Sequence, residues 1–260
     1  MNRRVFGFLL VITTLLLTSC DTDQSADILL YSDKGTAESC VIATKNMFQW
    51  MGYSVAMVEA DYINNNDLSN FRIICFPGGN MYQYSQDLSS KGKSKIREFI
   101  SDGGGYIGIC GGAYFSAKRV IWQGNLLPIE PLEIFQGSTK GPIDEIAPYP
   151  ECTMCKITIV DSTHPITQSE YDTTWIQYCY GPMLLPFSDA NLTILGRYDI
   201  GGKPSIVAFE FGDGRVFLIG AHPEYEEDSD RDSISSCDTL DDWGSDWELM
   251  KKATLWCLKK

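Results

Sequence analysis

Strand-length apolar runs that alternate with helical segments constrain the fold of this chain most strongly. Four such runs occupy residues 27–33, 54–60, 71–76 and 106–109. A run that is apolar throughout is typical of a strand buried on both faces, as in parallel sheets covered by helices. Residues 36–51, with Thr36 as the expected N-cap, and residues 93–101 have helical patterns. The first half is therefore a parallel α/β sheet, and ligands of such sheets bind beyond the carboxyl ends of the strands.

The second half has a weaker pattern. Residues 122–155 are rich in Gly and Pro and predict long loops with little regular structure. Short strands are expected at 156–160 and 192–197, and Gly212-Asp213-Gly214 predicts a hairpin between strands at 204–211 and 215–220. Ser245 to Glu248 matches a capping box and predicts a last helix to about residue 259. Because no repeat or composition break divides the chain, we expect one domain over residues 27–260.

The amino-terminal segment has the pattern of an export signal. Arg3 and Arg4 precede an uncharged apolar run, Val5 to Leu17, which is too short to span a bilayer. The run ends in Leu17-Thr18-Ser19-Cys20, which resembles a bacterial lipobox. We therefore expect a lipoprotein signal peptide at 1–19, a lipid on Cys20, a polar tether over 20–26, and a chain held on the periplasmic or cell-surface side of a bacterial membrane. A plain signal peptide with an incidental cysteine is the alternative.

The charge of the chain excludes one class of partner. Thirty-four Asp and Glu residues face 21 Lys and Arg residues, a net charge of −13, and removal of Arg3 and Arg4 would leave it more negative. Such a surface repels phosphate backbones, so we expect no nucleic-acid partner. The oligomeric state does not follow from the sequence.

The positions of the nine cysteines do not indicate a disulfide framework. Cys40, Cys75, Cys179 and Cys257 lie in apolar runs and are expected to be buried thiols. Cys152 and Cys155 form a single C-x-x-C pair, and the chain has two histidines. A zinc site needs more ligands, so we expect no metal; a local disulfide or two unpaired thiols is the favoured interpretation of the pair.

The segment around Cys110 carries the strongest chemical signal. Gly108-Ile109-Cys110-Gly111-Gly112 joins a buried strand to the next helical segment. A nucleophile on such an elbow needs small neighbours, because the strand and the helix cross closely there. The turn would also aim the N–H of Gly111 at an oxyanion and place the sulfur near a helix N-terminus, which favours the thiolate. The alternative is a Gly-rich turn that buries an inert cysteine.

Two further segments favour the catalytic interpretation. His222-Pro223-Glu224 follows the last strand, where His222 would serve as the base and Glu224 would orient it, which makes an acyl-transfer triad with Cys110. His164 is the rival base. Pro77-Gly78-Gly79 follows the third strand, and the backbone N–H groups of Gly78 and Gly79 would complete the oxyanion site with Gly111.

These motifs resemble the class I glutamine amidotransferase-like superfamily, and in particular the branch named after the N-terminal domain of biotin-protein ligase. The superfamily match lies in Phe76–Gly79, 108–115 and His222–Glu224; the branch match lies in 132–142 and 177–182. The resemblance implies a flavodoxin-like three-layer sandwich with a mostly parallel central sheet. It also implies attack of Cys110 on an amide carbonyl and a thioester intermediate, with no cofactor.

Two hypotheses of function follow. In the first, the chain is a membrane-anchored, thiol-dependent amidase or hydrolase acting on a small-molecule or peptide amide. Glutamine-dependent relatives pass ammonia to a synthetase, and an exported chain has no evident acceptor, so we expect a different amide. In the second, the chain is a catalytically silent ligand-binding lipoprotein on the same fold.

An acidic stretch follows the histidine motif. Eleven acids and one base, Arg231, lie between Glu224 and Glu248. A solvated surface loop is the favoured interpretation. An EF-hand is rejected because Ser233 and Thr239 stand where the loop needs Gly and Glu, although an irregular calcium site stays open.

Overall fold

The computed structural model describes residues 25–226, 230–235, 238, 240 and 244–260, so the predicted signal peptide and Cys20 lie outside the described residues. The strands are β1 Ile28–Tyr31, β2 Val55–Val58, β3 Ile73–Phe76, β4 Gly105–Ile109, β5 Ala117–Trp122, β6 Asn125–Leu126, β7 Phe135–Gly141, β8 Cys152–Ile159, β9 Thr173–Cys179, β10 Met183–Pro186, β11 Thr193–Tyr198, β12 Pro204–Phe211 and β13 Gly214–Ile219. The helices are α1 Glu38–Trp50, α2 Ala60–Asn65, α3 Met81–Asp87, α4 Ser90–Ser101, α5 Gly111–Ser116, the 3-10 turn η1 Asp230–Asp232 and α6 Trp247–Cys257.

The central sheet has nine strands in the order β2-β1-β3-β4-β13-β12-β11-β8-β9. The strands from β2 to β13 pair in parallel, and those from β13 to β9 pair antiparallel. The α/β fold class is therefore as predicted, but the central sheet is mixed rather than mostly parallel, because the second half of the chain adds an antiparallel extension. β3, β4 and β13 are neighbours, so the segments that follow them meet at one edge of the sheet.

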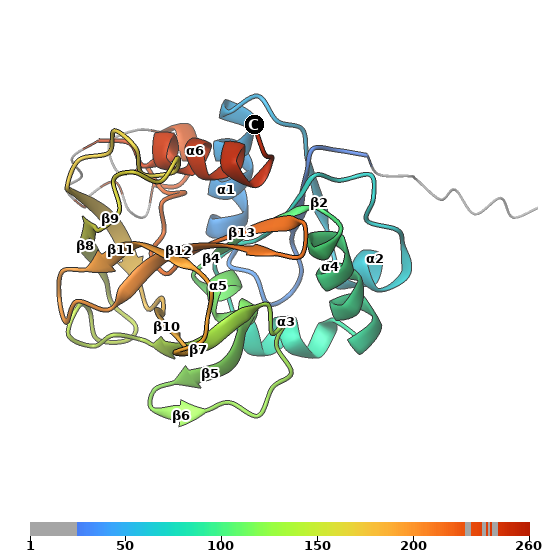
Figure 1. The fold of residues 1–260 in the computed structure, drawn as a ribbon, viewed down its shortest axis with the longest axis horizontal. Coiled ribbons are helices and arrows are strands. Elements are labelled where there is room, and N and C mark those ends of the chain that lie inside the picture. The colour runs from blue at the N-terminus through green and yellow to red at the C-terminus, as the bar shows by residue number, and fades with distance from the viewer. Residues whose placement is uncertain (1–24, 227–229, 236–237, 239, 241–243) are drawn as a thin grey trace, which may run out of the picture.

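Helices cover both faces of this sheet (Figure 1). Alternate residues of each buried strand point to opposite faces, so the chain has two apolar layers. Leu30, Ile107 and Phe217 pack toward α1 and α6. Leu29 and Ile74 pack on the other side with residues of α2 to α5. This sandwich of helix, sheet and helix holds the strand ends rigidly.

The prediction of loops over 122–155 is correct for 127–134 and 142–151 but wrong for 135–141. β7 lies in that range, and it pairs with β5 and β10 in a second sheet of order β10-β7-β5-β6. Its sequence, Phe-Gln-Gly-Ser-Thr-Lys-Gly, has low strand propensity, but its odd positions are buried and its even ones more exposed. Tertiary pairing rather than local preference makes this segment a strand.

One disulfide corrects the predicted roles of two cysteines. Cys152 is bonded to Cys179 rather than to Cys155, and Cys179 is not a free thiol. The register of β8 and β9 places Cys152 directly opposite Cys179, whereas residues three apart on a strand point to opposite faces. Cys40, Cys75, Cys155 and Cys257 are free and buried.

The helix starts are also refined. Thr36 does not cap α1: the N-cap is Ala37, and the Thr36 hydroxyl donates instead to the carbonyl of Asp33 at 2.6 Å. The capping box predicted at Ser245 does not form, because the N-cap of α6 is Asp246 and its side chain makes no cap hydrogen bond. The Ser245 hydroxyl accepts instead from the amide of Trp247 at 3.1 Å. None of the helices in the described part of the chain has the length and apolar character needed to cross a bilayer.

The described part of the acidic stretch is folded rather than a freely solvated loop. Arg231 is paired with Glu226 and lies over the ring of Trp247 at 4.6 Å. Asp232 is buried, and its carboxylate accepts the amides of Glu226 and Ile234, both at 2.9 Å. Asp228, the first residue of the suggested calcium pattern, lies outside the described residues.

Candidate functional site

Cys110 lies at the turn between β4 and α5, in a backbone conformation that non-glycine residues rarely adopt. Its φ is 46° and its ψ is −99°. The turn is crowded: a Cβ on Gly108 would lie 2.9 Å from the backbone of Gly112, and one on Gly112 would collide with the backbone of Phe76. Glycines are therefore required here, as the sequence predicts for an elbow.

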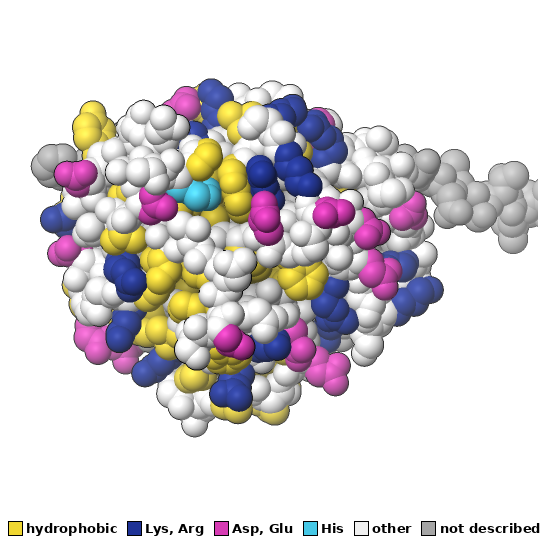
Figure 2. All heavy atoms as spheres, viewed as in Figure 1, with side chains coloured by type: hydrophobic (Ala, Val, Ile, Leu, Met, Phe, Trp, Pro, Cys, Tyr) yellow, Lys and Arg dark blue, Asp and Glu magenta, His cyan; other side chains and the backbone are white. Residues whose placement is uncertain are grey.

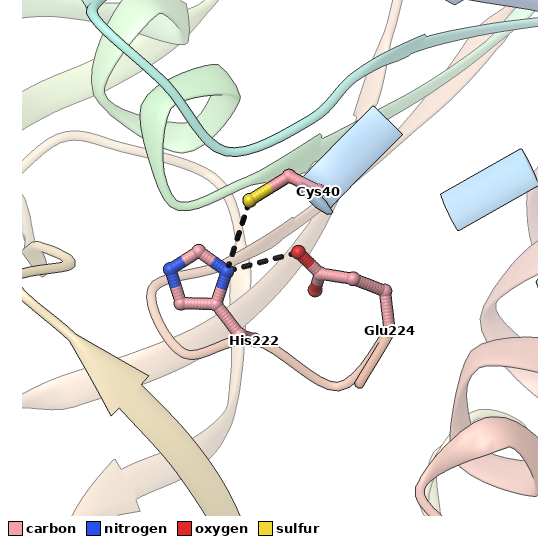
Figure 3. Close-up of side chains that lie close together, drawn as sticks. All are labelled: Cys40, His222 and Glu224. Atoms are coloured by element: carbon pink, nitrogen blue, oxygen red, sulfur yellow. Dashed lines mark hydrogen bonds and ion pairs between the residues drawn. The ribbon is translucent and has the colours of Figure 1, made fainter. Parts of the chain in front are cut away.

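His222 and Glu224 lie beside this turn and are hydrogen-bonded to each other (Figure 3). The Nδ1–H of His222 donates to Oε1 of Glu224 at 2.9 Å, since a carboxylate is an acceptor. Both side chains are almost fully buried. Burial strengthens the hydrogen bond between them because water does not screen it. The same hydrogen bond fixes the plane of the imidazole ring.

The end of β9 holds the other side of the imidazole. The carbonyl of Cys179 accepts from His222 Nε2 at 3.4 Å and lies 3.7 Å from the sulfur of Cys110. The backbone N–H of His222 donates to the carbonyl of Gln177 at 2.8 Å. Cys110 and His222 therefore share one acceptor, and their reactive atoms face the same small region. Sequence reasoning missed this role of β9, although the motif at 177–182 marked the segment.

The electrostatics favour a charged imidazole. Burial lowers the pKa of His222, but negative charge on Cys110, on Glu224 and on Cys40 outweighs burial and raises that pKa well above its ordinary value. An imidazolium that keeps its proton at neutral pH stabilises a thiolate next to it.

Cys40 is a second sulfur at the site. It projects from α1, with its sulfur 3.8 Å from Nδ1 of His222 (Figure 3). The same sulfur lies 3.1 Å from the hydroxyl of Tyr225. Burial raises the pKa of this thiol. The sulfur, imidazole and carboxylate of Cys40, His222 and Glu224 lie within 4.8 Å of one another, a spacing that a metal could bridge. The hydrogen bond from Nδ1 of His222 to Glu224 already explains why these two side chains lie close together. That the site holds no metal stays a prediction.

The three predicted oxyanion donors are backbone amides of the Pro77–Gly79 turn and of the elbow. Asn80 N–H donates to Gly35 and Ala37 N–H donates to Gly78, which fixes the Pro77–Gly79 turn. Among the described residues, the N–H groups of Gly78, Gly79 and Gly111 donate to no protein acceptor. A Cβ on Gly111 would lie 2.6 Å from the nitrogen of Gly79, so these two peptides adjoin. Free N–H groups next to a nucleophile are the donors that an oxyanion needs.

A cavity of about 700 Å³ opens onto Cys110, His222 and Cys40. A second cavity, of about 770 Å³, lies at the amino ends of the strands around Phe71, Arg72 and Gly104 and contains none of the predicted site residues. His164, the rival base, is not at the site: its ring packs 5.3 Å from Trp256 of α6. Burial lowers the pKa of His164.

Solved structures with this arrangement of elements support the fold. The structure of PurLQS from Thermotoga maritima superposes with a TM-score of 0.59 at 14% identity, covering 89% of this chain and 98% of that chain. A GMP synthase subunit protein from Thermoplasma acidophilum gives a TM-score of 0.57 at 13% identity, covering 91% and 96%. These likenesses establish a glutamine amidotransferase-like fold.

Sequence comparison identifies the family. The chain is 25% identical to a biotin–protein ligase of Schizosaccharomyces pombe over 76% of its own length, and spans 33% of that ligase. It is 26% identical to an uncharacterized protein of Chlamydia muridarum, covering 76% of this chain and 80% of that one. The profile of the family "Biotin-protein ligase, N terminal" matches residues 26–253. The chain therefore belongs to the biotin-protein ligase N-terminal family.

Proposed function

We propose that this protein is a thiol-dependent amidase or hydrolase in which Cys110 is the nucleophile, His222 the acid and base, and Glu224 the residue that orients His222. One observation carries the proposal: the strained turn at Cys110 presents its sulfur to a cavity, beside an imidazole bonded to a buried carboxylate. These are the parts of an acyl-transfer site.

The proposed reaction has two halves. The Cys110 thiolate attacks the amide carbonyl carbon while the N–H groups of Gly79 and Gly111 stabilise the oxyanion. His222 gives its proton to the leaving nitrogen, the C–N bond breaks, and ammonia or an amine leaves a thioester on Cys110. Water then loses a proton to His222 and adds to the thioester, after which the C–S bond breaks, a carboxylic acid leaves and the thiolate is restored.

We also propose that the chain is exported and anchored through a lipid on Cys20. The lipobox-like sequence supports the anchor. The Cys152–Cys179 disulfide supports export, because structural disulfides persist mainly in oxidising compartments.

Ammonia release tests the catalytic proposal. The purified protein is incubated with a panel of primary amides that includes glutamine and peptidoglycan fragments, next to Cys110→Ser and His222→Gln variants. We expect release from at least one amide, abolished by Cys110→Ser and reduced about 10²- to 10⁴-fold by His222→Gln. Release that survives Cys110→Ser contradicts the proposal. Binding of an amide without turnover in the wild-type protein favours the catalytically silent alternative.

A further inference from the structure

The cavity at Cys110 has a chemical character that restricts its substrate. The described residues that line it combine the reactive groups with aromatic and neutral polar side chains, such as Asn80, Tyr114, Trp122, Tyr149, Gln177 and Tyr180. None of these described residues is Lys, Arg, Asp or Glu. Outside the described part, the sequence contains only two basic residues, Arg3 and Arg4.

A carboxylate on the substrate would therefore have no Lys or Arg partner among these residues, and the imidazolium of His222 is already paired with Glu224. A buried anion without a cation or several hydrogen bonds is strongly unfavourable. The net charge of −13 adds a long-range repulsion. Glutamine carries an α-carboxylate only a few bonds from its amide, so this cavity does not suit glutamine. The same property favours departure of the carboxylate product that hydrolysis would form.

Aromatic rings form one wall of the cavity. Tyr114 lies edge-on to Trp122 at 5.7 Å, Trp122 to Tyr149 at 5.6 Å, and Tyr149 to Tyr180 at 5.2 Å. Tyr149 is 51% exposed, so the row runs from the buried side of the site to solvent. Neighbouring rings at these spacings offer both edges and faces to another flat group.

Gln177 contributes one unsatisfied acceptor. Its side chain is 1% exposed and lines the cavity, and its amide nitrogen donates to the sulfur of Cys179 at 3.2 Å. Within the described structure, its Oε1 has no hydrogen-bond partner. A buried acceptor is stabilised by a donor, and an amide N–H of a substrate would supply one.

We infer that the substrate is an uncharged amide whose acyl part carries an aromatic ring, which packs on the wall formed by Trp122, Tyr149 and Tyr180. This inference rests on the proposed function, since it takes Cys110 as the atom that the carbonyl must reach.

Three chloromethyl ketones with one reactive group test it: chloroacetone, a phenyl-bearing analogue, and a glutamine-shaped analogue with a free ammonium and carboxylate. In each case the Cys110 sulfur displaces chloride from the CH₂ group and forms a C–S bond, which mass spectrometry assigns to Cys110. We expect the phenyl compound to react about tenfold faster than chloroacetone, and the glutamine-shaped compound to react more slowly than chloroacetone.

Variants locate the selectivity. Trp122→Ala combined with Tyr149→Ala should bring the phenyl-to-chloroacetone ratio close to one, while Tyr171→Ala, at an 86% exposed aromatic outside the cavity, should leave it unchanged. A wild-type ratio near one, or faster reaction of the glutamine-shaped compound, overturns the inference. If all three compounds react no faster with Cys110 than with a free thiol, the proposed function is overturned. The phenyl-to-chloroacetone ratio then still decides whether the cavity prefers an aromatic group.

Discussion

At the scale of single residues, the site depends on one sulfur and one imidazole. Cys110 has a positive φ, which is a strained backbone conformation for a residue with a side chain. Such strain persists only where the surrounding packing enforces it. His222 is bonded to Glu224 through Nδ1, so its Nε2 side is the one directed toward Cys179 and Cys110. The carboxylate of Glu224 behind the ring is one of the charges that raise the pKa of His222.

Replacing that carboxylate with an amide tests this dependence. Glu224→Gln keeps the size of the side chain and an oxygen that can accept from Nδ1, but removes its charge. The pKa of His222 should fall, because Glu224 is one of the charges that raise it. A lower pKa makes the imidazolium less stable beside the sulfur, and we expect alkylation of Cys110 at neutral pH to slow about tenfold. Glu248→Gln, at an exposed carboxylate, is the matched control; equal rates in both variants would refute the role of Glu224.

At the scale of elements, the first half of the fold could be predicted and much of the second half could not. The strands β1, β3 and β4 are buried on both faces, so their apolar runs are unambiguous. β7 has a polar, Gly-rich sequence and exists because β5 and β10 pair with it. The elbow, the Gly-Gly turn and His222-Pro-Glu224 were recognisable because each follows a strand. The contributions of Cys179, Gln177 and Cys40 were not, because their contacts with His222 join residues distant in sequence.

The bond between β8 and β9 gives a prediction at this scale. The disulfide joins two residues with a sequence separation of 27. A disulfide that closes a loop of that length stabilises the folded protein by about 2–4 kcal/mol. A Cys152→Ser, Cys179→Ser variant should lose that much free energy of unfolding in denaturant titrations. Reductant should lower the stability of the wild-type protein by a similar amount and leave the variant unchanged. A variant as stable as the oxidised wild type would contradict this assignment.

The molecule as a whole combines an acidic α/β domain with a proposed lipid anchor at Cys20. Basic side chains lie among acidic ones on the face shown in Figure 2. The family match covers residues 26–253 of this chain. The ligase from Schizosaccharomyces pombe is about three times as long as the part of it that matches this chain. The activity of that longer protein is therefore no guide to this one.

Export and anchoring give separable outcomes in cells. Cys20→Ser should move the protein from the membrane fraction to the soluble fraction, because the acyl chains would be lost. Deletion of residues 1–19 should keep the chain in the reducing cytoplasm and leave Cys152 and Cys179 as thiols, measured by a thiol-labelling gel shift. A Cys20→Ser protein that stays in the membrane fraction would refute the anchor, and oxidised cysteines in the deletion variant would remove the support for export.

The pH dependence of Cys110 alkylation by iodoacetamide distinguishes a thiolate paired with an imidazolium from an ordinary cysteine. Because the pKa of His222 is raised, the imidazolium should persist above its ordinary range, and the rate should stay nearly constant from about pH 6 to about pH 8. In His222→Gln the rate should fall about tenfold for each unit below the thiol pKa of about 8.5. A wild-type profile with that same slope, unchanged by His222→Gln, would show that Cys110 is an ordinary cysteine.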